Sequence, residues 1–339
     1  MTDTHTATIA SYYHPTDKGA ECDLCPHHCH LEEGQYGLCR NRFCQGHAIY
    51  SSVYGRACAL HIDPVEKKPL LHFHPAISCL SVGTTGCNLS CDNCQNADIS
   101  QTESNSIETI KIQPEELVGT CIRYNCPAIA YTYNEPITFY EYMFDSALLA
   151  QKRGIWNILV SAGYINPEPL KRLCKVIDAA NIDLKSFSDK LYHRVNHASL
   201  GPVLDTLITL KESGTWIEIT NLIIPTINDD RKMIRNMCRW LVSNGFEETP
   251  LHFSRFYPSY RMRILPPTPL DTLTDVYHIA QDEGIKYVYL GNVAEIDGEN
   301  TYCPSCGKLL IKRDGFNVLQ NHIKESKCSH CGTYINGRW

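Results

Sequence analysis

The sequence lacks the long apolar runs of a membrane protein. Nowhere in its 339 residues does a stretch reach the roughly 18 consecutive apolar residues of a membrane-spanning helix. The opening residues, MTDTHTATIASYYHPTD, also lack the charged start and continuous apolar core of a secretory signal. We therefore expect no membrane contact and a location in the reducing cytoplasm.

The sequence also lacks an excess of positive charge. Its 31 Lys and Arg residues are outnumbered by 37 Asp and Glu residues, which gives a formal net charge of −6. This balance excludes a protein-wide positive field that would attract nucleic acid or anionic lipid, but it leaves a local basic patch open. Internal repeats and low-complexity tracts are absent as well.

Cysteine, in contrast, is abundant, with 18 residues. A chain of this length with 43% hydrophobic residues can build a core without disulfides. In a reducing compartment, clustered thiols therefore indicate metal ligation. Three clusters have short, regular spacing; we expect the scattered cysteines to be ordinary core or surface residues, namely Cys58, Cys79, Cys121, Cys126, Cys174 and Cys238.

The composition divides the chain into three parts. Residues 1–75 form a Cys-rich N-terminal module with a connecting segment, residues 76–295 a central domain, and residues 296–339 a small C-terminal module. Gly, Pro and His are frequent between the N-terminal cysteines, which predicts irregular structure there up to about residue 60.

The central part alternates strand-like and helix-like segments. Short β-rich runs occupy residues 76–82, 128–134, 156–163, 180–186, 216–225, 251–257 and 287–292. Helices are predicted near residues 114–124, 138–152, 167–176, 202–213, 229–243 and 270–283. This alternation predicts an α/β fold with a parallel sheet, a partial or full TIM-type (β/α) barrel. In such barrels the chemistry lies at the carboxyl ends of the strands.

Three cysteines follow the first strand directly. Cys87, Cys91 and Cys94 stand in the Gly-flanked stretch GCNLSCDNC. Three thiolates can hold three irons of a [4Fe–4S] cube and leave the fourth iron open to another ligand, as in sites built for chemistry. The alternative is a zinc site completed by a distant residue such as His74 or Cys79.

The CxxxCxxC spacing after a first barrel strand resembles the signature of the radical SAM superfamily. The resemblance implies that S-adenosylmethionine (SAM) binds the open iron, and that one electron from the cluster cleaves SAM to methionine and a 5′-deoxyadenosyl radical. The superfamily usually has an aromatic residue before the third cysteine, against the adenine. This chain has Asn93 there, so the resemblance leaves only its backbone to read the adenine edge.

The same resemblance implies residues that hold SAM at later strand ends. Glu135 matches the acid that receives the methionine amino group, although an acid and Pro136 could simply open the next helix. Ser161 matches a hydroxyl for the ribose. Asp183 and Lys185, in an Asp-Leu-Lys stretch, share one face of their strand and could serve the cofactor or merely neutralise each other.

Two further cysteine sets flank the barrel. The C-terminal set is Cys303, Cys306, Cys328 and Cys331, in which a 21-residue gap separates two CxxC pairs, and it indicates a zinc ribbon. The lysines and arginines around it could compensate the thiolates or bind a partner or RNA. The N-terminal set is Cys22, Cys25, Cys29 and Cys39, with Cys44 as a rival ligand, and it fits zinc or an auxiliary [4Fe–4S] cluster equally well.

Over nearly its full length the chain resembles the radical SAM enzyme of the AmmeMemoRadiSam system, which is similar to the activating enzymes of pyruvate formate-lyase. The stretches CDLCPHHC, HIDPVEKKPLLHF, YNEP, NIDLK and EITNLIIPTIND carry this resemblance. It implies Amme-type and Memo-type proteins as partners, and an electron donor. The glycyl radical activases have a histidine after the sixth strand, where this chain has Pro258.

These observations favour a radical SAM enzyme that abstracts hydrogen from a protein or small molecule, and an activase of the glycyl radical type is one form that such an enzyme can take. The alternative is a non-catalytic protein: an iron–sulfur electron carrier, or a metal-stabilised module that binds a partner or RNA. That reading gives Glu135, Asp183 and Lys185 no common purpose.

Overall fold

The computed structural model describes residues 7–293 and 298–339. The expected boundary between residues 295 and 296 lies outside the described residues. The central feature is an eight-stranded sheet with the order β16-β15-β14-β13-β12-β11-β9-β8. Its strands are β8 (Ala59–Pro64), β9 (Ser78–Gly83), β11 (Ala128–Tyr131), β12 (Trp156–Ser161), β13 (Ala179–Asp183), β14 (Trp216–Ile223), β15 (Leu251–Arg255) and β16 (Val288–Gly291).

The seven strands from β9 to β16 pair in parallel, and β8 pairs antiparallel with β9. Within the described chain the two outer strands, β8 and β16, do not pair with each other, so the sheet forms a partial barrel. This confirms the predicted α/β fold and its partial-barrel form. β8 belongs to the residues that we assigned to the N-terminal module, yet it extends the barrel sheet.

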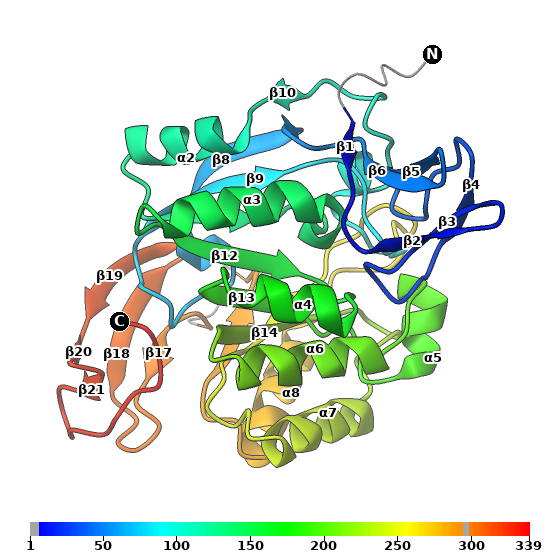
Figure 1. Cartoon of the computed structure of the whole chain (residues 1–339). Helices are drawn as coiled ribbons and strands as arrows, with labels where there is room; N and C mark the ends of the chain where they lie inside the picture. Colours follow the sequence, from blue (N-terminus) through cyan, green and yellow to red (C-terminus); the bar gives the residue numbers. More distant parts are fainter. Residues whose placement is uncertain (1–6, 294–297) are drawn as a thin grey trace.

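Helices cover the outer face of this sheet (Figure 1). They are α2 (Pro114–Arg123), α3 (Tyr140–Gln151), α4 (Pro167–Leu173), α6 (Gly201–Glu212), α7 (Arg231–Ser243) and α8 (Leu270–Asp282). Their starts carry local signals: the Asp230 carboxylate, for example, accepts from the Met233 backbone N–H at 2.7 Å and caps α7. The strands between them are buried on both faces, as parallel strands require. No helix in the described ranges is long and apolar enough to cross a bilayer.

Shorter helical pieces lie in the connections. They are η2 (Val65–Lys67), α1 (Ala97–Ser100), η3 (Pro136–Phe139), α5 (Asp189–Leu191) and the π-helical turn η4 (Tyr192–Asn196). The sequence patterns did not predict α1, α5 or η4, because each is too short to show a helical period.

The N-terminal module is not irregular, which corrects our expectation. It contains two three-stranded antiparallel sheets, one of β2 (Tyr13–Thr16), β3 (Gly19–Cys22) and β4 (His30–Glu32), the other of β1 (Thr8–Ile9), β6 (Ala48–Ser51) and β5 (Arg42–Gln45). Gly46 and His47, with φ of +57° and +61°, form the tight turn between β5 and β6. A further short pair joins β7 (Arg56–Ala57) to β10 (Ile110–Lys111).

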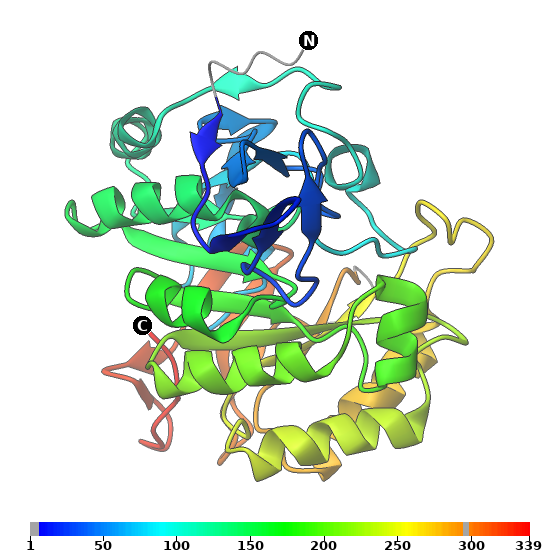
Figure 2. The same cartoon turned by 45° about the vertical axis from the view of Figure 1, so that its right-hand side comes forward.

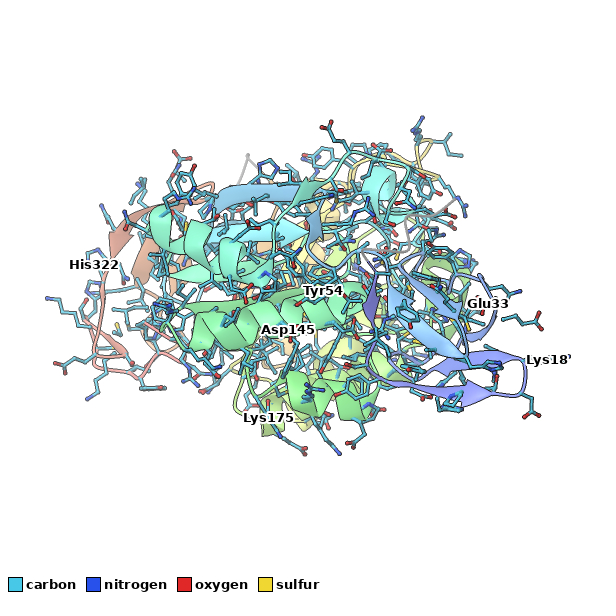
Figure 3. All side chains as sticks on the ribbon, turned by 45° about the horizontal axis from the view of Figure 1, so that its top comes forward. Lys18, Glu33, Tyr54, Asp145, Lys175 and His322 are labelled. Atoms are coloured by element: carbon cyan, nitrogen blue, oxygen red, sulfur yellow. The ribbon has the colours of Figure 1, made fainter. Side chains whose placement is uncertain are left out.

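The C-terminal module lies at the opposite end of the barrel, where the strands begin. Its strands are β17 (Thr301–Tyr302), β18 (Leu309–Asp314), β19 (Asn317–Asn321), β20 (Ile323–Lys324) and β21 (Lys327–Cys328). Leu310 and Ile311 pack with Leu71 and with Tyr287 and Tyr289, which flank the start of β16. Figure 3 shows this separation, with His322 at one end of the molecule and Lys18 and Glu33 at the other.

Buried polar groups close the barrel at this C-terminal-module end. The Glu218 carboxylate, which is fully buried, accepts from the backbone N–H groups of Leu71 and His72 at 2.9 and 2.7 Å and pairs with His252 Nε2 at 2.7 Å. Burial lowers the pKa of His72 to about 4, so this imidazole is neutral at pH 7. His252, the second residue of β15, thus belongs to a structural network far along the strand from the carboxyl ends.

Candidate active site and metal centres

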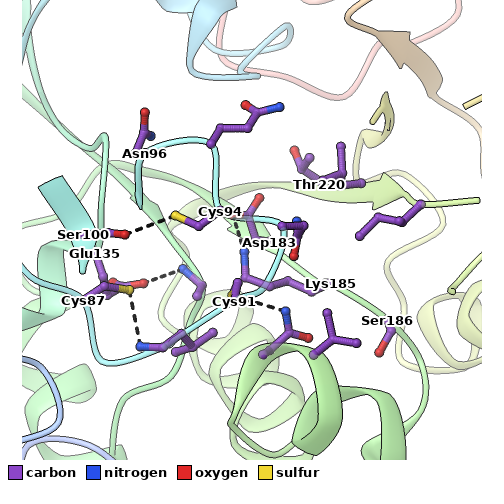
Figure 4. Close-up of a pocket in the computed structure, with 18 of the residues that line it drawn as sticks. Cys87, Cys91, Cys94, Asn96, Ser100, Glu135, Asp183, Lys185, Ser186 and Thr220 are labelled. Carbon is purple, nitrogen blue, oxygen red and sulfur yellow. Dashed lines mark hydrogen bonds and ion pairs between the residues drawn. The ribbon is translucent and has the colours of Figure 1, made fainter. Parts of the chain in front are cut away.

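A pocket of ≈ 270 Å³ opens at the carboxyl ends of the barrel strands. Its lining brings together seven predicted site residues from three separate strand ends: Cys87, Cys91, Asn93, Cys94, Glu135, Asp183 and Lys185. Figure 4 labels all of these except Asn93. Ser161 does not line the pocket, but its hydroxyl donates to Glu135 Oε1 at 2.7 Å. Among the described residues, no fourth cysteine lines this pocket.

The loop with the three cysteines is held on several sides. Gly86 begins it with φ of +80°, and a Cβ there would lie 2.3 Å from the Cys39 carbonyl oxygen, so only glycine fits. The Gly86 N–H donates to the Ile99 carbonyl at 2.8 Å, and the Asp92 N–H donates to that of Val195 at 2.9 Å. The cysteines are therefore fixed by the chain before any metal binds.

Each cysteine sulfur in this loop has one hydrogen-bond partner. The Leu89 backbone N–H reaches Cys87 Sγ at 3.3 Å, the Asn196 side-chain amide reaches Cys91 Sγ at 3.2 Å, and the Ser100 hydroxyl lies 3.1 Å from Cys94 Sγ. Figure 4 draws these contacts as dashed lines. Such contacts stabilise bound thiolates and tune an iron–sulfur cluster. We did not predict Asn196 or Ser100, which lie in the short helices η4 and α1.

Burial raises the pKa of Cys87 well above its ordinary value, and the nearby Glu135 carboxylate adds to this effect. Burial also raises the pKa of Cys91, although the Lys185 ammonium opposes the shift. Without a cation these side chains stay protonated thiols. A bound metal supplies the positive charge that makes their thiolate forms stable.

Glu135 has both a structural and a pocket-facing role. Its carboxylate accepts from the Ser161 hydroxyl at 2.7 Å and from the Ala162 and Ile137 backbone N–H groups at 2.8 and 3.2 Å. The last contact caps η3, which is the alternative that the sequence left open. Burial raises the pKa of this carboxyl, and the three hydrogen bonds oppose the rise. Oε1 thus accepts two hydrogen bonds and Oε2 one, so Oε2 keeps a lone pair for a cationic group.

Asp183 and Lys185 form an ion pair in the pocket wall, with Lys185 Nζ 2.9 Å from Asp183 Oδ2. Burial disfavours the ammonium, but Asp183 and the Cys91 sulfur outweigh this cost and raise the pKa of Lys185. The Asn228 side chain donates to the Lys185 carbonyl at 2.8 Å and also lines the pocket. The mutual pairing predicted as an alternative is present, and both side chains still face the pocket.

Two pocket amides lack a protein partner for one oxygen. Asn93 Oδ1 and Asn134 Oδ1 are buried and accept no hydrogen bond from the described chain. Buried polar atoms are normally satisfied, so these oxygens indicate a polar ligand in the pocket. Three thiols, a carboxylate, an ammonium and unsatisfied amides together fit an iron–sulfur cluster with a charged, hydrogen-bonding co-ligand such as SAM.

A loop after β15, residues 256–269, projects from the barrel (Figure 2, yellow) and contacts the three-cysteine loop. The Ser259 hydroxyl donates to the Asn93 carbonyl at 2.9 Å, and the Arg261 backbone N–H donates to the Asp92 carbonyl at 3.0 Å. The Arg261 guanidinium also pairs with the Asp92 carboxylate at 3.2 Å. One side of the Asn93 backbone is therefore already occupied.

The C-terminal cysteines are drawn together. All four sulfurs lie within 4.8 Å of one another, and the Cys303–Cys331 and Cys306–Cys328 pairs are 3.6 and 3.9 Å apart. A zinc ion with four Zn–S bonds of about 2.3 Å requires sulfur separations of this size. The geometry is that of a four-ligand metal site.

The N-terminal cysteines surround a space. Cys22, Cys25, Cys29 and Cys39 all line one small cavity, together with Asn88 from the cluster loop. Unlike the C-terminal set, no three of these sulfurs meet within 4.8 Å in the described chain. Burial raises the pKa of Cys25 to about 12 and that of Cys39 to about 11. Cys44 does not line the cavity.

Comparison with known proteins decides the family. Residues 81–241 match the family described as the radical SAM superfamily. An uncharacterized protein of Methanocaldococcus jannaschii is 44% identical over 322 residues, which cover 94% of this chain and 96% of that protein. The chain belongs to the radical SAM superfamily. Radical SAM chemistry, with a [4Fe–4S] cluster and SAM, is what this membership supports in general.

More distant radical SAM proteins share parts of the chain. The pyruvate formate-lyase-activating enzyme of Clostridium pasteurianum is 23% identical over 158 residues, which cover 45% of this chain and 64% of that enzyme. The structure of SuiB of Streptococcus suis, bound to its precursor peptide SuiA, matches with a TM-score of 0.50 and 12% identity over 67% of this chain and 51% of that one. The chain thus spans less than two thirds of either protein, and the SuiB match shows the fold alone.

Proposed function

We propose that this chain is a radical SAM enzyme that uses Cys87, Cys91 and Cys94 as the three ligands of a catalytic [4Fe–4S] cluster. The observation that supports this most is the convergence of three hydrogen-bonded cysteines, without a fourth, on a pocket at the carboxyl ends of parallel strands. When bound, the cluster supplies one electron for reductive cleavage of SAM to methionine and a 5′-deoxyadenosyl radical.

The protein's own groups would bind and orient the cofactor. Glu135 presents carboxylate lone pairs to the methionine ammonium, and Ser161 and the Ala162 N–H hold that carboxylate in place. Lys185 presents its ammonium to the methionine carboxylate, while Asp183 orients Lys185 and can accept from a ribose hydroxyl. Asn93 and Asn134 offer their unpartnered amide oxygens to donors on the cofactor. The Ser259 and Arg261 contacts hold the cluster loop at the pocket mouth.

The substrate is the hydrogen donor, and its class is open between a protein and a small molecule. Similarity to a pyruvate formate-lyase-activating enzyme supports an activase that installs a glycyl radical in a partner. On the resemblance to the AmmeMemoRadiSam system we propose Amme-type and Memo-type proteins as partners, together with an electron donor. On the spacing of the C-terminal cysteines we propose zinc in that module, and we propose a cytoplasmic location. A glycyl radical partner would give a characteristic EPR doublet after incubation, whereas a metabolite would instead yield a modified product.

The first experiment is anaerobic. The purified protein is reconstituted with iron and sulfide, reduced with dithionite, and assayed for 5′-deoxyadenosine from SAM beside the C87A/C91A/C94A variant. A Cys174→Ala variant is the matched control, because Cys174 lines neither cysteine pocket. We expect 5′-deoxyadenosine from the intact protein and the control only. A cluster whose EPR signal is indifferent to SAM, with no 5′-deoxyadenosine, would overturn the proposal in favour of an electron carrier.

A further inference from the structure

The cavity lined by the N-terminal cysteines shares a wall with the three-cysteine loop. Cys22 ends β3, Cys25 and Cys29 lie between β3 and β4, and Cys39 precedes β5. The facing wall comes from the barrel: Asn88 of the cluster loop, and Ile137 and Thr138 of η3. The blue N-terminal strands accordingly lie over the ends of the green barrel strands in Figure 2.

Direct contacts join the two cysteine sets. The Cys39 carbonyl oxygen would lie only 2.3 Å from a Cβ on Gly86, so the residue next to Cys87 packs against a cysteine of the other set. On the same side, His27 Nε2 lies 2.7 Å from the Asn88 carbonyl oxygen. On both sides, each contact is made by a cysteine or by a residue within two positions of one.

The spread of the N-terminal sulfurs favours a cluster over a single ion. A zinc ion binds all four sulfurs itself and so requires them to lie as close together as the C-terminal sulfurs do. A [4Fe–4S] cube needs wider spacing, because each sulfur binds a different iron. The N-terminal sulfurs line a cavity without meeting, and four apolar side chains also line it, namely Leu24, Leu31, Leu38 and Ile137.

A buried guanidinium supplies an N–H donor to this cavity. Arg42 is almost fully buried and lines the cavity, and its Nη1 lies 3.6 Å from Cys22 Sγ. The same guanidinium pairs with Glu141 and donates to the Ser11 carbonyl, so its position is fixed. Hydrogen bonds from such donors to cluster sulfurs favour the reduced, more negative state.

We propose that Cys22, Cys25, Cys29 and Cys39 bind a second [4Fe–4S] cluster, and that this cluster passes electrons to the cluster at Cys87, Cys91 and Cys94. The N-terminal cluster takes one electron from a low-potential one-electron donor, a flavin or iron–sulfur protein, and goes from the 2+ to the 1+ state. It then returns to 2+ as the catalytic cluster is reduced from 2+ to 1+. The relay rests on the proposed function, whereas the identity of the second cluster does not.

The test of cluster identity uses the full chain with the C87A/C91A/C94A substitutions, which leave the N-terminal cavity intact. After anaerobic reconstitution we expect about four iron atoms per chain and, after dithionite reduction, a [4Fe–4S]⁺ EPR signal that SAM does not change. Adding C25A and C29A should abolish both the bound iron and the EPR signal, while adding C174A should change neither. Zinc without iron in the triple variant would overturn the second cluster, whatever the 5′-deoxyadenosine assay shows.

The test of the relay uses C25A/C29A alone, which keeps the catalytic cysteines. With dithionite, a small reductant, the catalytic cluster should still give an EPR signal that SAM perturbs. With reduced flavodoxin as the donor, the intact protein should give this SAM-sensitive EPR signal and the variant should not. Equal reduction of both by flavodoxin would overturn the relay. If the variant does not fold, intact protein mixed rapidly with flavodoxin decides instead, since the SAM-insensitive signal must rise before the SAM-sensitive one.

Discussion

The two ends of the chain each carry four cysteines, but they present them in opposite ways. The C-terminal sulfurs lie within 4.8 Å of one another, and Cys306 and Cys331 are exposed at the surface. The N-terminal sulfurs are spread around a cavity that the barrel helps to wall. The sequence spacing identifies four cysteine ligands in both cases. Only the geometry separates a set sized for one ion from a set sized for a larger group.

The two sets also lie at opposite ends of the barrel. The N-terminal set packs behind the cluster loop, at the carboxyl ends where barrel proteins carry out chemistry. The C-terminal set packs through Cys303 and Cys328 against Tyr287 and Tyr289, at the end where strands begin. This placement predicts that the C-terminal set stabilises the fold and that the N-terminal set takes part in the reaction.

The largest expected effect is loss of the catalytic cluster. Replacing Cys91 with alanine removes one of the three proposed iron ligands, so 5′-deoxyadenosine production should disappear while the proposed zinc at the C-terminal set and iron at the N-terminal set should remain. Metal analysis and the SAM cleavage assay measure this together. Loss of all three metals in a folded variant would show that the sites are not separate.

Glu135→Gln should have the next largest effect. The amide keeps a hydrogen-bond acceptor but removes the negative charge that we assign to the SAM ammonium, so SAM should bind about 10- to 100-fold more weakly. The affinity can be followed through the SAM-induced change in the cluster EPR signal. Glu168→Gln, on the exposed face of α4, is the control. Unchanged SAM affinity would leave Glu135 only its helix-capping role.

Cys303→Ser should destabilise the molecule without stopping the chemistry. It should release zinc and lower the melting temperature, because Cys303 is part of the core that joins the module to Leu71 and Tyr289. The iron content and 5′-deoxyadenosine formed per folded molecule should stay near those of the intact protein. Calorimetry and metal analysis check both halves. A loss of iron instead would break the proposed contrast between the two ends.

The smallest effect is expected at Asn196. Asn196→Ala removes the side-chain donor to Cys91 Sγ, 105 residues away in sequence, and leaves every iron ligand in place. The cluster should still assemble, but its reduction potential should fall, since a hydrogen bond to sulfur stabilises the reduced state. A redox titration followed by EPR measures the shift, with Asn244→Ala on the far side of the barrel as the control. An unchanged potential would make the contact merely structural.

Much of the barrel could be predicted from sequence, because its strands are continuous apolar runs and its helices have clear starts and lengths. β8 could not be predicted, since its consecutive exposed residues His61 and Ile62 break the alternation of a half-buried strand and only pairing with β9 makes it a strand. The hairpins of the N-terminal module are held by turn residues such as Gly46 and His47 rather than by apolar periodicity.

The candidate site shows the same limit. The three cysteines, Glu135, Asp183 and Lys185 follow recognisable motifs, and the structure brings them to one pocket. Asn196 and Ser100 reach the cysteine sulfurs from short helical turns without a motif, so no local pattern identifies them. The wall that Asn88 shares with the N-terminal cysteines depends on contacts between segments about 60 residues apart in sequence, as in the 61-residue separation of His27 and Asn88.

The most direct test of the contrast between the two ends is the metal content of the intact chain. After anaerobic reconstitution with iron and sulfide in the presence of zinc, iron and zinc are counted per chain, and X-ray absorption at the zinc edge reports the ligands. The account predicts about eight iron atoms and one zinc ion held by four sulfurs at about 2.3 Å. About four iron atoms and two zinc ions, both held by four sulfurs, would contradict it.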